Sequence, residues 1–151
     1  METDCMVQAS HKNQKAEGTA AMYAQTTHSV KITVVPQFLD DQSKPNNRHF
    51  VWAYHVRIEN VGADTVQLLA RHWRITDSNG GTHEVVGEGV VGEQPVLKPG
   101  EKFEYTSGTP LTTPSGIMSG SYRMITKGGE SFDAEIPAFS LDSPHHRASL
   151  N

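Results

Sequence analysis

The sequence has little of several features that define other classes of protein. It contains a single cysteine, Cys5, which excludes a disulfide framework and a metal site built from cysteines. Its apolar runs are only a few residues long, which excludes a membrane-spanning helix. The 13 lysines and arginines form no cluster and are outnumbered by 17 acidic residues, so we expect no nucleic-acid-binding surface.

The two ends of the chain also lack the pattern of a folded segment. Residues 1–27 are polar and charged, and they contain no apolar stretch of the kind that a secretory signal peptide requires. We therefore expect a cytoplasmic protein with a disordered extension over residues 1–27, one domain over residues 28–144 and a tail over residues 145–151. Met22, shortly before the first patterned segment, is a candidate for the true start of the protein.

From His28 onward, apolar residues recur at every second position, and glycine, proline, asparagine and aspartate separate the segments. The alternation slips near Leu68, which predicts a β-bulge or a split strand. Residues 77–81 contain aspartate, asparagine and two glycines, a combination that predicts a hairpin turn. About seven short strands with no helix predict an all-β fold, an antiparallel fibronectin type III-like (immunoglobulin-like) β-sandwich. The expected strands cover residues 30–34, 50–58, 65–77, 82–86, 102–107, 120–126 and 131–136.

Gly87, Gly89 and Gly92 form a G-x-G-x-x-G pattern, here called the glycine loop (residues 87–92). In a dinucleotide-binding fold this pattern opens a helix, but Pro95 follows too closely for a helix to form. Three roles remain for the loop. It could serve backbone geometry alone, or bind a phosphate through successive N–H groups with Mg²⁺ bridging the flanking glutamates, or contact a partner through Val90 and its neighbour near the surface.

Few residues carry a pattern typical of catalysis or metal binding. His83 and Glu84 begin like a zinc-protease motif, but glycine follows where the second histidine should stand. His145 and His146 in the tail form a weak candidate pair for a divalent metal, without a third ligand. No nucleophile elbow is present, so we expect no enzyme, no catalytic residue and no cofactor.

A second candidate surface is cationic. Because Trp73 and its apolar neighbours should face the core, His72 and Arg74 should face the opposite side of the strand. If His55 and Arg57 on the preceding strand lie beside them, one sheet carries a patch that suits an acidic peptide or a phosphate. The alternative is an ordinary solvated sheet face.

Several segments of the chain together resemble the ApaG family. The most specific are residues 87–95, where the glycine block ends in glutamine and proline, and residues 105–108, with the order Tyr-Thr-Ser-Gly. The resemblance covers most of the chain, from about His28 to Pro144. The further segments that carry it are residues 50–54, 66–76, 99–101 and 120–124.

The resemblance implies a fibronectin type III-like sandwich without enzymatic activity. It also implies a link to cobalt and magnesium resistance or efflux, and to a neighbouring diadenosine tetraphosphatase gene. Similar domains are fused to F-box and polymerase-interacting proteins in eukaryotes, which implies a protein-binding module. We therefore predict a non-enzymatic module that binds an unidentified protein partner. The alternatives are a phosphate or nucleotide ligand with Mg²⁺ at the glycine loop, direct metal binding by the tail histidines, and homodimerisation through an exposed strand edge.

Overall fold

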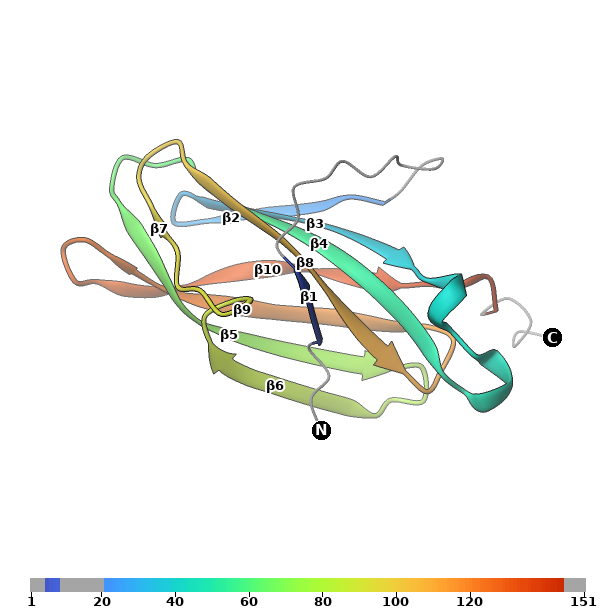
Figure 1. Ribbon diagram of the computed structural model, residues 1–151. Coiled ribbons are helices and arrows are strands. Elements are labelled where there is room, and N and C mark those ends of the chain that lie inside the picture. The colour runs from blue at the N-terminus through green and yellow to red at the C-terminus, as the bar shows by residue number, and fades with distance from the viewer. Residues whose placement is uncertain (1–4, 9–20, 146–151) are drawn as a thin grey trace.

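The computed structural model describes residues 5–8 and 21–145 of the chain (Figure 1). These residues form ten strands and two short 3₁₀ turns, η1 (Asp40–Gln42) and η2 (Pro45–Asn47). No helix in this part of the chain is long and apolar enough to cross a membrane. The strands are β1 (Cys5–Gln8), β2 (Tyr23–Thr27), β3 (Val30–Phe38), β4 (Phe50–Asn60), β5 (Val66–Asp77), β6 (Thr82–Glu88), β7 (Val96–Leu97), β8 (Lys102–Leu111), β9 (Gly116–Thr126) and β10 (Ser131–Leu141).

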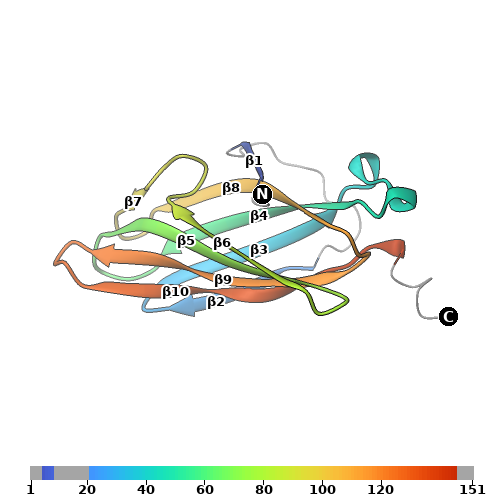
Figure 2. The ribbon, with the colours of Figure 1, turned by 90° about the horizontal axis from the view of Figure 1, so that it is seen from below.

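The strands form two antiparallel sheets that stack as a sandwich (Figures 1 and 2). The first sheet has the order β1-β8-β4-β3-β2, and the second has the order β10-β9-β5-β6, with β7 paired to one end of β5. The predicted all-β antiparallel sandwich is confirmed, and each of the seven expected strands has a counterpart. The expected slip near Leu68 is a shift of register between Leu68 and Ala70, where β5 pairs with β9.

The fold begins earlier in the chain than the alternation predicted. Residues 23–27, expected to be part of a disordered extension, form β2 and pair with β3 from Tyr23 opposite Val34 to Thr27 opposite Val30. The turn between the two strands uses positive φ angles at His28 (46°) and at the serine after it (67°). Because neither residue is glycine or asparagine, the sequence carried no hairpin signal there. β1 also lies in the expected extension, of which residues 1–4 and 9–20 lie outside the described part of the chain.

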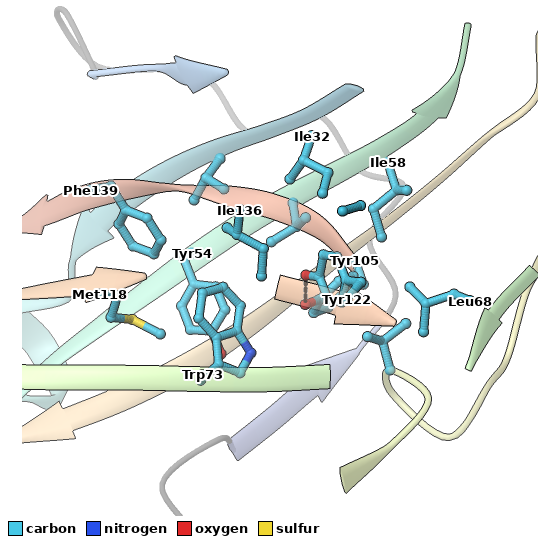
Figure 3. Close-up of a cluster of buried hydrophobic side chains, with 14 of the residues drawn as sticks. Ile32, Tyr54, Ile58, Leu68, Trp73, Tyr105, Met118, Tyr122, Ile136 and Phe139 are labelled. Carbon is cyan, nitrogen blue, oxygen red and sulfur yellow. Dashed lines mark hydrogen bonds between the residues drawn. The ribbon is translucent and has the colours of Figure 1, made fainter. Parts of the chain in front are cut away.

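Alternation along β4 decides which side chains fill the space between the sheets. Every second residue of β4 is buried, from Phe50 to Asn60, because successive side chains point to opposite faces of a sheet. Trp73 of β5 is central to the aromatic cluster in Figure 3, where its ring meets those of Tyr54, Tyr122 and Phe139 at centroid distances of 5.2, 6.3 and 6.1 Å. The burial of each such side chain contributes about 1.5–3 kcal/mol to the stability of the fold.

The two long sides of the sandwich differ. On one side, β10 packs against β2 and β3, and the Glu135 amide donates to Thr27 Oγ1 across the two sheets at 3.2 Å (Figure 2). On the other side, β1 covers the edge of β8, whereas β6 forms the outer edge of the second sheet. Among the described residues β6 pairs with β5 alone, and most of its side chains are exposed.

Candidate functional site

The candidate site consists of β6 and the glycine loop that follows it. β6 begins after the predicted turn, where the Asp77 carboxylate accepts hydrogen bonds from the backbone N–H groups of Asn79 and Gly81, both at 2.9 Å. Gly80 has a φ of 91°, as a tight hairpin requires. This turn fixes the register, so that Arg74 lies opposite Glu84 and His72 lies opposite Val86 on the outer face of the second sheet.

The charges on this outer face are paired with one another. Arg74 Nη2 donates to Glu84 Oε2 at 3.1 Å, and His72 Nε2 lies 3.2 Å from Glu84 Oε1. The hydrogen bond from Arg74 and then that from His72 lower the pKa of Glu84, with the positive charge of Arg74 adding to them. Arg74 and His72 are therefore both hydrogen-bonded to a carboxylate of the same protein, and this face is not an open cationic site for an acidic ligand.

The predicted cationic patch of His55, Arg57, His72 and Arg74 is wrong. His55 and Arg57 lie on β4 in the first sheet, whereas the other two lie on β5 in the second sheet. The chain crosses from one sheet to the other between β4 and β5, so the outer faces of these strands look in opposite directions. Each pair also has its own partners, since His55 Nε2 lies 2.7 Å from Glu104 Oε1, and Arg57 lies 3.6 Å from a carboxylate oxygen of its neighbour on the same face.

The glycine loop is closed by hydrogen bonds within the backbone. The Gly89 N–H donates to the Leu69 carbonyl at 2.9 Å, and Val90 and Glu93 exchange two bonds of 2.8 Å. Gly89 and Gly92 have φ angles of 65° and 81°, which glycine adopts without strain. Val90 was expected near the surface, but it is 1% exposed and belongs to the core, because the loop is held against β5 by the bond from the Gly89 N–H to the Leu69 carbonyl.

Arg71 holds the loop from the side of β5. Its guanidinium Nη1 donates to the carbonyls of Glu88 at 3.1 Å and Gly89 at 3.0 Å. It lies across Gly87, where an added Cβ would be 2.9 Å from Nη1, so the absence of a side chain at Gly87 makes room for it. Sequence reasoning missed Arg71, because a contact between positions 71 and 87 depends on strand register rather than on local spacing.

These contacts limit what the glycine loop can bind. A backbone nest for a phosphate needs several N–H groups that point outward together. The N–H groups of Gly89 and Val90 in this loop, and of Glu93 directly after it, already donate to carbonyls. Two loop carbonyls point at Arg71, and the carboxylates of Glu88 and Glu93 lie exposed on either side. The loop therefore shows the features of a structural support, with an acidic surface.

β6 carries an exposed apolar side chain on its outer face. Val86 is 73% exposed, and it lies between Glu84 and Glu88 on the outer face, because alternate residues of a strand share a face. The outer edge of β6 (residues 82–88), here called the β6 edge, therefore presents an apolar residue between two acidic ones. The sequence predicted a short strand over residues 82–86, but only the topology shows that this strand is an edge.

The described residues contain no group of three or more histidines, cysteines, aspartates or glutamates placed to hold a metal ion. His145, a candidate metal ligand in the expected tail, packs instead on the rings of Phe38 and Phe50, each at a centroid distance of 5.8 Å. His146 lies outside the described residues.

The chain is similar to known proteins over most of its length. A family model described as the ApaG domain matches residues 40–126. Proteins named ApaG from Rhodospirillum centenum and Paramagnetospirillum magneticum are each 64% identical over 130 residues, which is 86% of this chain and 100% of each relative. A crystal structure described as the ApaA protein of Bordetella pertussis matches with a TM-score of 0.75 and 46% identity, over 76% of this chain and 94% of that chain.

Proposed function

The chain belongs to the ApaG family, and from this premise we propose that it is a non-enzymatic module that binds an extended segment of another protein along the β6 edge. The observation that carries the proposal is an edge strand that pairs on one side only, among the described residues, and bears an apolar side chain that is 73% exposed. The outward N–H and C=O groups of an edge strand are a template for another strand. Many peptide-binding domains use this mode of recognition.

The side chains of β6 define the chemistry of the partner. Cross-strand neighbours on one face of a sheet interact directly, so a partner residue opposite Val86 should be apolar. The exposed carboxylates of Glu88 and Glu93 favour lysine or arginine beside that residue. Glu84 contributes less, because its charge is already balanced by Arg74 and its second oxygen lies beside His72. The expected partner is therefore a basic, extended segment with a central apolar residue.

The geometry of the histidines supports a non-enzymatic role. His55 with Glu104 and His72 with Glu84 form pairs that resemble a base and its orienting acid. Both pairs lie on outer sheet faces, and none of these four residues lines the cavities at the two ends of the sandwich. On this proposal, the link to cobalt and magnesium implied by the family operates in the cytoplasm through the bound partner.

The test is a titration of the labelled full chain with a synthetic peptide of the length of β6, with a central isoleucine flanked by lysines. We expect saturable NMR shifts along residues 82–88 and slower amide hydrogen exchange there. Val86→Lys should weaken binding at least about tenfold, because it sets a lysine against the lysines of the peptide. Ile117→Lys is the matched control, since Ile117 is 52% exposed on the same sheet but lies on β9, away from the edge.

Equal binding by the Val86→Lys and wild-type chains would overturn the proposal. A concentration-dependent dimer in analytical ultracentrifugation, abolished by Val86→Lys, would make a second copy of this chain the occupant of the β6 edge. Saturable shifts centred on residues 87–92 with pyrophosphate and Mg²⁺ would instead favour the phosphate-ligand alternative.

A further inference from the structure

A cavity of about 450 Å³ lies at one end of the sandwich. Three connections far apart in the sequence meet there: the segment that carries η1 and η2, the turn between β5 and β6, and the turn between β8 and β9. In Figure 1 these connections lie together at the right-hand end of the molecule. The cavity is separate from the glycine loop, and no residue of the loop lines it.

Hydrogen bonds hold the wall of the cavity in place. The buried Thr113 hydroxyl donates to the Ser115 carbonyl at 2.8 Å and accepts the Ser78 N–H at 3.2 Å, which ties the two turns together. On the opposite wall, Lys44 and His49 exchange backbone hydrogen bonds of 2.7 and 3.1 Å around η2. The cavity therefore has a defined shape before any ligand enters.

Arg48 projects from this second wall and supplies the only charge among the lining residues. Its backbone has φ 56° and ψ 45°, a left-handed conformation that costs a non-glycine residue about 1–2 kcal/mol. No ion pair joins Arg48 to another residue in the described part of the chain. The carboxylate of Asp77, in the same turn as Ser78, accepts hydrogen bonds from two N–H groups of that turn. It forms no ion pair with Arg48.

The other lining groups are neutral. Ser78 and Thr112, which carry hydroxyl groups, and Asn79, which carries an amide, are among the lining residues, and Phe50 and Pro114 provide apolar surface. One guanidinium, two hydroxyls and an apolar wall suit a ligand with one anionic group and an organic part. The volume lies within the range of roughly 300–1,000 Å³ typical of small-molecule sites, and a phosphate group alone would fill only part of it.

We propose that this cavity binds a small phosphate monoester. The Arg48 guanidinium pairs with two phosphate oxygens, as its planar fork of donors allows. The hydroxyls of Ser78 and Thr112 donate to the phosphate, and the organic part lies against Phe50 and Pro114. This site is independent of the β6 edge, so either proposal can fail without the other.

The test is an NMR titration of the labelled full chain with glycerol 3-phosphate, with inorganic phosphate and with glycerol. We expect saturable shifts of the backbone amides of Asn79, Thr112 and Thr113 with glycerol 3-phosphate, weaker binding of inorganic phosphate, and no shifts with glycerol. The proposal would be overturned if glycerol 3-phosphate did not saturate the shifts at about 10 mM, or if the shifts fell on residues 87–92. Inorganic phosphate bound as tightly as the monoester would overturn the role of the apolar wall.

Two variants distinguish a specific binding site from non-specific electrostatic attraction of anions. Arg48→Gln should weaken the binding of glycerol 3-phosphate at least about tenfold, because it removes a charge-assisted hydrogen bond. Lys44→Gln is the matched control, since it removes a positive charge from the same segment but from a residue outside the cavity lining, and it should change affinity less than about twofold. An equal effect of the two variants, with both still folded by circular dichroism, would contradict a specific site.

Discussion

The glycine loop and the Arg48 cavity show opposite uses of polar groups. In the loop and at the residue that follows it, three N–H groups donate to backbone carbonyls, and two loop carbonyls accept from Arg71. The cavity is lined by an arginine and by residues with hydroxyl groups, with no carboxylate among the lining residues. The comparison shows that glycine spacing reports the backbone conformation of a loop, whereas a ligand site requires donors whose hydrogen bonds are not already used.

The largest expected effect tests whether the glycine loop is closed. An added Cβ at Gly89 would lie 2.4 Å from the Glu93 carbonyl oxygen, and the φ of 65° is unfavourable for alanine. Gly89→Ala should therefore destabilise the fold by about 2–4 kcal/mol, measured by chemical denaturation. Gly92→Ala is the control, because its φ is also positive but nothing lies within 4 Å of the added atom, so about 1 kcal/mol is expected.

Equal, small losses for the two glycine variants would show that the loop opens easily in solution. The contrast with the Arg48 cavity would then fail, because the loop N–H groups would be available to an anion.

The second prediction concerns the wall of the Arg48 cavity. Thr113→Val leaves the Ser115 carbonyl and the Ser78 N–H without their buried partner, and should cost about 1–2 kcal/mol of unfolding free energy. Thr112→Val, at an exposed neighbour, should change stability by less than about 0.5 kcal/mol. Comparable losses of unfolding free energy in both variants would contradict the different roles given to the two residues. Thr113 would then not be a structural residue of the cavity wall, and Thr112 would not be a residue free to bind a ligand.

The third prediction concerns the side chain that closes the loop. Arg71→Met keeps much of the apolar stem but removes two charge-assisted hydrogen bonds to carbonyls, and should cost about 1–2 kcal/mol. Hydrogen exchange at the amides of Gly89 and Val90 should quicken, because the loop loses its lateral support. Unchanged exchange in this variant would show that the backbone bonds hold the loop without Arg71.

The sequence predicted the layers of the fold well, because burial in a sandwich follows a period of two. Tyr54, Val56 and Ile58 alternate with polar residues and are all buried. The family resemblance read from the motifs is also confirmed. β2 was missed because its turn at His28 contains no glycine or asparagine. β7 is only two residues long, too short to show a period.

The candidate sites were harder to predict, because they depend on which strands become neighbours. His55 and His72 share an alternating pattern, but the connection after Asn60 carries the chain to the other sheet. Arg71 meets Gly87 through strand register, and Arg48 lines the same cavity as Thr113, and no local spacing reveals either arrangement. The charge of a residue could be read from the sequence, but not the partner that neutralises it.

The smallest expected effect on stability tests that neutralisation directly. Because Arg74 and His72 lower the folded-state pKa of Glu84 below its ordinary value, the pair stabilises the fold at pH values above that ordinary value. This contribution is lost as the pH falls through the lowered pKa. Arg74→Gln should move the Glu84 pKa toward its ordinary value, followed by NMR of the side-chain carboxyl carbon. His72→Gln should move it less, since Arg74 is the largest cause.

An unchanged Glu84 pKa in the Arg74→Gln chain would show that the pair does not persist in solution. Arg74 would then be a cation without a fixed partner, as Arg48 is among the described residues. The β5–β6 face and the cavity would become equal candidates for an anionic ligand. The lowered pKa of Glu84 is therefore the property that separates a charge used within the fold from a charge open to a ligand.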